Sequence, residues 1–92
     1  MSYFVYILVS EIDRTLYTGQ TSDLSARLTH HNRKKVKSTK NRAPYRIGYI
    51  EKFETRSAAM QREWELKTSY NTDRKKKLIK EFDAQILNEI LR

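Results

Sequence analysis

The stretch LYTGQTSDLSARLTHHN, residues 16–32, decides how the rest of the chain is interpreted. Its pattern predicts the end of a strand, a glycine turn, a helix cap and then an amphipathic helix. Gly19 suits a tight turn at the end of the strand, because it has no Cβ. Either Ser22 or Asp23 can cap the helix that follows, since both side chains accept hydrogen bonds from backbone N–H groups.

Two side chains of the predicted helix lie beside its apolar stripe. Leu24 and Leu28 are one turn apart, and Arg27 and His31 share or border the stripe that they form. Burying a guanidinium or an imidazole is costly without a partner, so both are candidates for a binding site. Alternatively, both extend from the edge of the stripe into water. These two residues alone favour neither interpretation.

Length and composition limit what the chain can be. Its 92 residues predict a single domain, 1–92, with a modest core. The sequence has no apolar run that could span a membrane, no signal peptide and no cysteine, so we expect a cytoplasmic protein without disulfides. Its two histidines, His30 and His31, are adjacent, which is poor spacing for zinc. The net charge of +8 favours a polyanionic partner, most simply nucleic acid, over a basic surface that binds nothing.

A hairpin is predicted at the start of the chain. Residues 3–9 (YFVYILV) form a continuous apolar and aromatic run, which is typical of a strand buried on both faces. A polar turn separates this run from residues 15–20, which predict a second strand. Tyr6 and Tyr17 lie within these strands, and in isolation each is best explained by core packing.

A third strand and two helices follow. Residues 45–54 alternate, and we expect one face to carry Tyr45, Ile47, Tyr49 and Phe53. Thr55 or Ser57 can cap a helix that continues to about Tyr70, and Asp73 can cap a last helix. The apolar stripe of that helix comprises Leu78, Ile79, Phe82, Ile86, Leu87, Ile90 and Leu91. The order β-β-α-β-α-α predicts an α+β fold, a three-stranded, mostly antiparallel sheet flanked by helices.

Positive charge is concentrated in two segments. Residues 33–42 predict an exposed basic loop with these candidate phosphate contacts: Arg33, Lys34, Lys35, Lys37, Lys40 and Arg42. Residues 74–77 place Arg74 and Lys75 at the start of the last helix, where positive charge opposes the helix dipole. Nearby phosphates would neutralise both segments, although many charged runs are simply solvated.

The role of the Glu63 carboxylate has two possible interpretations, a surface ion pair or a metal ligand. It lies four residues before Lys67 in the predicted second helix. A surface pair at this spacing stabilises a helix by about 0.2–0.5 kcal/mol and has no further role. The alternative, that Glu63 is a metal ligand, depends on a wider resemblance.

That resemblance is to the GIY-YIG nuclease superfamily. Residues 4–6 (FVY) and 17–19 (YTG) are similar to its paired signature, and both keep the tyrosine. Arg27 matches the helix arginine of the family, and Glu63 its metal-binding glutamate, with Lys67 at the usual place after it. The resemblance covers nearly the whole chain. It is closest to small stand-alone bacterial members of the UPF0213 type, which are similar to the nuclease domain of the eukaryotic structure-specific flap and junction endonuclease.

The resemblance implies a metal-dependent endonuclease. Glu63 would hold one divalent cation, Mg²⁺ or Mn²⁺, and Arg27 would contact the scissile phosphate. Tyr6, or else His31, would take the proton of the attacking water, and Tyr17 would orient the water or the phosphate. Nucleic-acid contacts would come from both basic segments together with Gly19 and Lys67.

The expected function is hydrolysis of DNA phosphodiester bonds, on branched or damaged DNA in repair or recombination. The alternative is a non-catalytic nucleic-acid-binding module that retains the fold. An RNA substrate stays open, because no feature of the sequence recognises a 2′-hydroxyl group. No recognition helix or zinc finger is present, so we expect DNA binding that depends on structure rather than sequence, with a protein partner as a further source of specificity.

Overall fold

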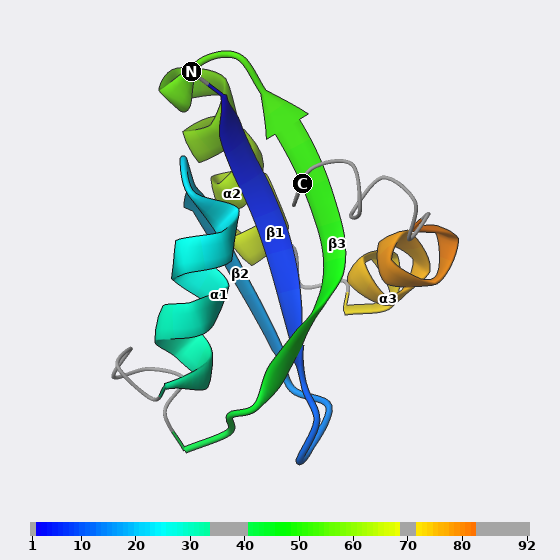
Figure 1. The fold of residues 1–92 in the computed structure, drawn as a ribbon. Coiled ribbons are helices and arrows are strands. Elements are labelled where there is room, and N and C mark those ends of the chain that lie inside the picture. The colour runs from blue at the N-terminus through cyan, green and yellow to red at the C-terminus, as the bar shows by residue number, and fades with distance from the viewer. Residues whose placement is uncertain (1, 34–40, 69–71, 83–92) are drawn as a thin grey trace.

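A computed structural model describes residues 2–33, 41–68 and 72–82. The elements are β1 (Tyr3–Ser10), β2 (Leu16–Thr21), α1 (Leu24–Asn32), β3 (Tyr45–Phe53), α2 (Arg56–Thr68) and α3 (Thr72–Glu81) (Figure 1). This order confirms the predicted α+β fold, and the strand boundaries differ from the prediction by only one residue at β1, β2 and β3. Within the described residues, no helix combines the length and apolar character needed to cross a bilayer.

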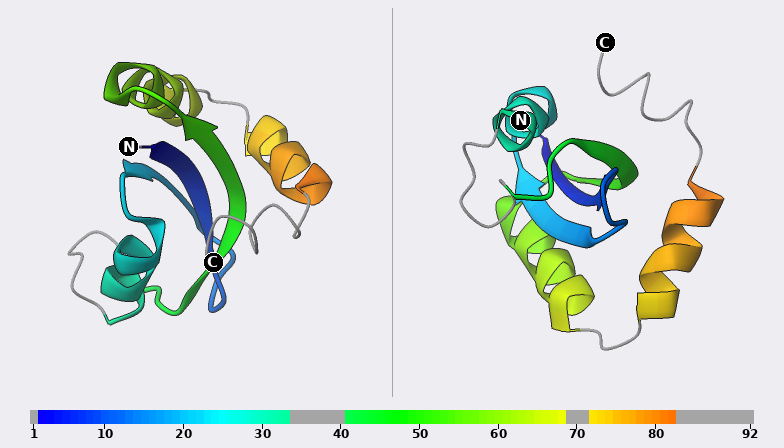
Figure 2. Two further views of the ribbon diagram at one scale, coloured as in Figure 1. Left: turned by 45° about the horizontal axis from the view of Figure 1, so that its top comes forward. Right: turned by 90° about the horizontal axis from the view of Figure 1, so that it is seen from below.

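β1 is the central strand of the sheet. The strand order is β2-β1-β3, and both neighbours run antiparallel to β1. All residues from Val5 to Val9 are buried, as their unbroken apolar run predicts for a strand covered on both faces. α1 packs on one face of the sheet, the α1 face, and α2 on the other, the α2 face (Figure 2). The α1 face carries Tyr6, Leu8 and Leu24, and the α2 face carries Val5, Ile7, Ala59 and Leu66.

β3 differs from the prediction because it contains a bulge. The register between β1 and β3 shifts between Ile7 and Leu8, which leaves Gly48 as an extra residue in β3. The four side chains expected on one face are therefore divided, with Tyr45 and Ile47 on the α1 face and Tyr49 and Phe53 on the α2 face. A Cβ at Gly48 would lie 2.9 Å from Val9 and 3.2 Å from Ile79 of α3, so the glycine also lets α3 approach the sheet.

The helix caps are decided by side-chain hydrogen bonds. Of the two candidates for α1, Asp23 accepts from the backbone N–H of Ala26 at 3.1 Å. At α2, the Thr55 hydroxyl accepts from the backbone N–H of Ala58 at 3.2 Å. The third predicted cap is wrong, because α3 begins one residue before Asp73 and includes it in its first turn.

Phe82 anchors the end of α3. Its ring meets Tyr49 edge to face, with centroids 5.8 Å apart, and is partly buried. The more distal half of the predicted stripe, residues 86–91, lies outside the described residues. We expect Phe82→Ala to lower the free energy of unfolding by about 2 kcal/mol, less than the 3–5 kcal/mol of a fully buried site. Urea denaturation should also show a smaller loss for Phe82→Leu, which keeps most of the apolar area; an unchanged midpoint for Phe82→Ala would contradict this packing.

Candidate active site

His31 lies at the centre of an aromatic cluster on the α1 face. It is fully buried, and its Nε2 atom is 3.3 Å from the Tyr6 hydroxyl. Its ring centroid lies 4.9 Å from that of Tyr17 and 6.1 Å from that of Tyr45. The two candidates on α1 therefore behave differently, because His31 is buried among tyrosines while Arg27 is exposed to solvent.

Gly19 makes room for the Tyr6 ring. The two residues pair directly across β1 and β2. A Cβ at Gly19 would lie 2.6 Å from Tyr6 Cζ, so the tip of the ring occupies the space of a side chain. The predicted exit turn is wrong here, because β2 continues to Thr21 and Gly19 does not have a positive φ. Gly19 is buried beneath Tyr6.

α2 brings a carboxylate and an amine to the same site. Glu63 Oε2 and Lys67 Nζ are 3.1 Å apart, so the ion pair considered from the sequence is present. The Lys67 amine lies 6.0 Å from the centroid of the Tyr17 ring, which in turn contacts His31. β2 is an edge strand. Side chains from helices on opposite faces of the sheet therefore meet beside Tyr17.

The Tyr6 hydroxyl links these groups electrostatically. Burial is the main cause that raises its pKa, and Tyr17 and Glu63 act in the same direction. The Arg27 guanidinium opposes them by favouring the ionised form. Tyr6 thus keeps its proton at neutral pH, and both Arg27 and Glu63 lie close enough to influence it.

The environment of His31 also favours the uncharged form, which for an imidazole means a lower pKa. Burial is the main cause that lowers the pKa of the imidazole below its ordinary value of 6.5, and the positive charges of Arg27 and His30 add to it. His31 is therefore neutral at neutral pH. When Nε2 is the unprotonated nitrogen, it can accept a hydrogen bond from the Tyr6 hydroxyl.

This shift predicts a pH-dependent stability. The unfolded chain binds a proton at His31 more readily than the folded protein, so the stabilisation is complete above about pH 6.5 and decreases as the pH falls towards the lower folded-state pKa. Urea denaturation at about pH 5 and pH 7.5 should show this loss. His31→Gln should reduce it, whereas the same change at exposed His30 should not. Equal pH dependence in all three proteins would contradict the assignment.

Asn32 positions the aromatic cluster, and sequence analysis missed this role. Its Nδ2 donates to the Tyr45 carbonyl at 3.2 Å, and its Oδ1 accepts from the Tyr45 N–H at 2.7 Å. These bonds hold the start of β3 beside the end of α1 and thereby bring Tyr45 against His31. The position of Asn32 next to His31 is the only local signal, and it does not reveal the partner.

Comparison with known proteins identifies the family. Residues 2–77 match the family model described as the GIY-YIG catalytic domain. The chain belongs to the GIY-YIG family. UPF0213 proteins from Staphylococcus aureus strains Mu3 and Mu50 are each 47% identical to it over 81 residues, which cover 87% of this chain and 96% of theirs. The solution NMR structure of a UPF0213 protein from Bacillus halodurans is 32% identical, with a TM-score of 0.53, and the match covers 83% of this chain and 81% of that one.

The GIY-YIG family is a nuclease superfamily, and the residues that carry the resemblance lie together in this fold. Tyr6 and Tyr17 come from neighbouring strands, Arg27 and His31 from α1, and Glu63 from α2. The signature tyrosines contact His31 directly, while Arg27 and Glu63 act on Tyr6 through their charges.

Among the predicted site residues of this GIY-YIG domain, Glu63 is the carboxylate that could serve a hard divalent cation. The Glu63 side chain is 21% exposed, and carboxylate oxygens and water are the ligands that Mg²⁺ prefers. In the described part of the chain, no three His, Cys, Asp or Glu side chains gather into a metal cluster. A cation there would take Glu63 as its carboxylate ligand. Lys67, which is half exposed, would have to move away from the Glu63 oxygen with which it pairs.

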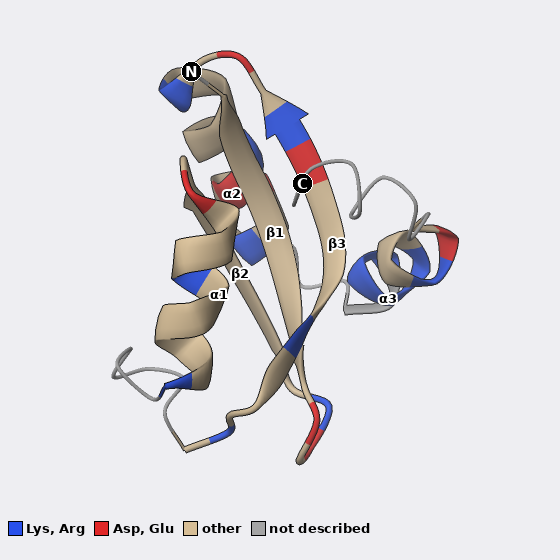
Figure 3. Ribbon diagram, viewed as in Figure 1, with Lys and Arg blue, Asp and Glu red and all other residues tan. Residues whose placement is uncertain are grey.

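The predicted nucleic-acid contacts of the GIY-YIG domain occupy more than one surface (Figure 3). Arg33 is exposed at the end of α1, and Arg74 and Lys75 lie on α3, where positive charge is dense. Arg42 is already paired with Asp13, with Nε and Oδ2 3.0 Å apart. The remaining loop lysines fall outside the described residues: Lys34, Lys35, Lys37 and Lys40.

Proposed function

We propose that this chain is a metal-dependent endonuclease that hydrolyses DNA phosphodiester bonds, on branched or damaged DNA, and that residues 1–92 act as one domain. The observation that supports it best is the meeting of three chemical functions beside the edge strand β2. These are the buried pair of Tyr6 and His31, the exposed guanidinium of Arg27 and the partly exposed carboxylate of Glu63. Phosphodiester hydrolysis needs a proton acceptor, a phosphate contact and a metal ligand.

Glu63 would hold a single Mg²⁺ or Mn²⁺ ion. A bound divalent ion neutralises charge on the phosphate and makes water a better nucleophile at neutral pH. Arg27 binds two oxygens of the scissile phosphate, because its planar guanidinium offers parallel donors. Tyr17, between His31 and Lys67, orients the attacking water or the phosphate.

Tyr6 and His31 together take the proton of the attacking water. Tyr6 cannot accept a proton unless it loses its own, because burial raises the pKa of its hydroxyl and keeps it protonated at neutral pH. Its neighbour His31 is neutral, and its Nε2 is 3.3 Å from the hydroxyl. The Tyr6 oxygen can therefore accept a proton from water while its own proton passes to His31.

DNA binding is electrostatic and largely independent of sequence. The net charge of +8 and the basic segments support it. Each phosphate contact releases counterions, so the affinity for DNA should fall steeply as salt rises. Specificity for branched DNA would then come from shape, or from a protein partner.

One observation favours the alternative of a non-catalytic binding module. The ion pair with Lys67 already neutralises the carboxylate that the metal requires. Both functions predict a basic surface that binds DNA, but only the nuclease requires a cation to replace Lys67 at the Glu63 carboxylate.

A cleavage assay separates the two functions. Labelled hairpin, flap, fork and Holliday-junction DNAs would be incubated with the protein in Mg²⁺, in Mn²⁺ and in EDTA, beside a linear duplex. The nuclease should cut in either metal, should stop in EDTA and should prefer the branched substrates. Salt-sensitive binding without a cut on any of these DNAs would support the binding module instead.

A further inference from the structure

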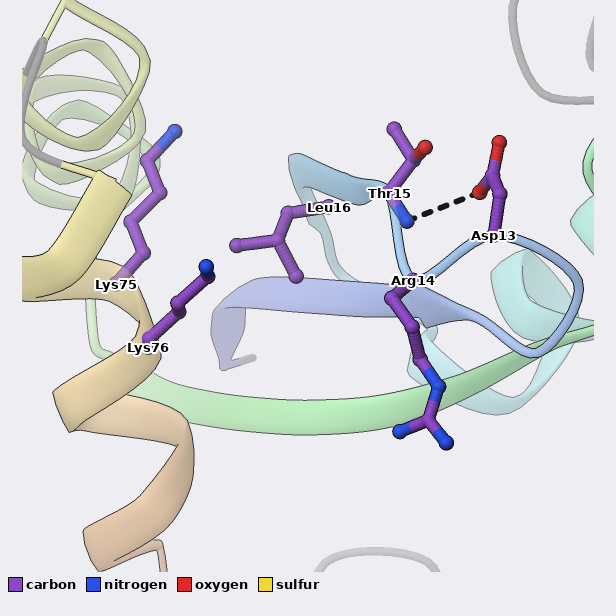
Figure 4. Close-up of a pocket in the computed structure, with 6 residues that line it drawn as sticks. All are labelled: Asp13, Arg14, Thr15, Leu16, Lys75 and Lys76. Carbon is purple, nitrogen blue, oxygen red and sulfur yellow. Dashed lines mark hydrogen bonds between the residues drawn. The ribbon is translucent and has the colours of Figure 1, made fainter.

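A concave site lies away from the aromatic cluster, between the β1–β2 turn and the first turns of α3 (Figure 4). This pocket has a volume of about 360 Å³, at the lower end of the roughly 300–1,000 Å³ of small-ligand sites. It is lined by Asp13, Arg14, Thr15, Leu16, Lys75 and Lys76. We call it the turn pocket.

The turn pocket has an excess of available positive charge. Arg14, Lys75 and Lys76 form no ion pair with any other described residue. Asp13 is the acidic residue of the lining, and its carboxylate is already engaged. One oxygen accepts from the Thr15 N–H at 3.0 Å, and the other lies 3.0 Å from Arg42 Nε. In Figure 4, Thr15 and Leu16 lie between the Asp13 carboxylate and the two lysines.

Arg14 has an unusual backbone for its residue type. Its φ is 65°, in the left-handed region that glycine or asparagine adopts at lower cost. The turn itself therefore does not require an arginine. An arginine in this backbone conformation, whose guanidinium has no described ion-pair partner, leaves that group available to a ligand.

Lys75 connects the turn pocket with the candidate active site. Burial is the main cause that lowers the pKa of its amine, and the charge of Lys67 acts in the same direction. Lys67 is the partner of Glu63. The charges of Lys67 and Lys75 therefore lie close enough to interact, and positive charge extends from Lys67, the partner of Glu63, to the edge of the pocket.

We propose that the turn pocket is a second phosphate-binding site, which holds the DNA backbone at a distance from the cleaved bond. This rests on the proposed function in taking DNA as the ligand. The two amines would contact phosphate oxygens on one side of Leu16, and the guanidinium of Arg14, which Figure 4 shows directed away from them, would contact those of another phosphate along the strand. Leu16 offers an apolar surface to the sugar between them. A free phosphate has the same chemistry, but the continuous charge towards Glu63 favours a phosphate within a strand.

Salt dependence of DNA binding tests the proposal. The variant Arg14→Gly/Lys76→Ala removes two charges, and neither change should strain the fold, since glycine suits a positive φ and alanine suits an exposed helix position. Its control, Lys52→Ala/Lys80→Ala, removes two exposed lysines that lie outside both basic segments and do not line the pocket. Affinity for a flap DNA would be measured in EDTA over a range of salt. The slope of log K against log salt should become shallower by about 2 in the pocket variant, and much less in the control. Equal changes would overturn the proposal.

Amide NMR shifts identify the ligand of the pocket. The flap DNA should shift the amides of Thr15 and Leu16 in the wild type and not in the pocket variant. Shifts with inorganic phosphate but not with DNA would overturn the assignment to DNA. Cleavage in Mg²⁺ is a separate readout. If the wild type shows both binding effects but does not cut, the nuclease is refuted and the pocket is supported. If the wild type cuts but the pocket variant has the same salt slope as the wild type, the nuclease is supported and the pocket is refuted.

Discussion

Glu63→Gln should reduce metal-dependent cleavage by about a thousandfold or more and leave the fold intact. A metal ion contributes several kcal/mol to stabilising the transition state, and each 1.36 kcal/mol corresponds to a tenfold change in rate. The amide keeps the shape of the side chain but lacks the charge that would bind the cation. The loss of the ion pair with Lys67 should cost only about 0.5 kcal/mol of stability, because the pair is partly exposed.

The matched control is Glu65→Gln. Glu65 lies on the same helix and has its own ion pair, to Arg62 at 3.3 Å, but it is not a predicted site residue. Its variant should cut at the wild-type rate. A Mn²⁺ titration followed by NMR should broaden signals around residue 63 in the wild type and the control, and not in Glu63→Gln. Unchanged broadening together with wild-type cleavage would refute the metal assignment.

Tyr6→Phe should reduce cleavage by about 10²–10⁴-fold, the usual contribution of a positioned proton acceptor. The aromatic ring still fills the space above Gly19, so the free energy of unfolding should change by only about 1 kcal/mol, for the hydrogen bond to His31. Tyr49→Phe is the control. It removes another tyrosine hydroxyl, which donates to Glu51 at 2.8 Å on the opposite face of the sheet.

A double variant tests whether Tyr6 and His31 act as one unit. If the proton passes from water through Tyr6 to His31, the combination of Tyr6→Phe with His31→Gln should be little worse than either change alone. Additive losses would show that the two residues act independently. Wild-type cleavage by Tyr6→Phe would leave His31 as the candidate base without a relay.

Local patterns in the sequence were sufficient to predict the helices, the strands and the family. The apolar run of residues 3–9 predicted a buried strand, since a strand covered on both faces needs no polar alternation. The sequence narrowed the N-terminal cap of α1 to two candidates, Ser22 and Asp23, because a cap bonds to a backbone group only three residues away. The signature residues 4–6 and 17–19 similarly predicted the family that residues 2–77 match.

Only the tertiary structure decided the register of β3 and the role of Gly19. The bulge at Gly48 is a property of the pairing with β1, so the alternation of residues 45–54 could not reveal it. Gly19 was expected to provide a turn, but its missing Cβ makes room for Tyr6 on the neighbouring strand. In both cases the deciding contact is with a segment that is distant in sequence.

The chemistry of the candidate site was likewise decided by packing. The sequence proposed His31 and Tyr6 as candidate bases, but only the fold places them 3.3 Å apart and buries both. Burial lowers the pKa of His31 and raises that of Tyr6, because it disfavours whichever form is charged. A sequence determines which groups can titrate. The assembled fold sets their exposure to water and their neighbours, and these determine whether each group is protonated at neutral pH.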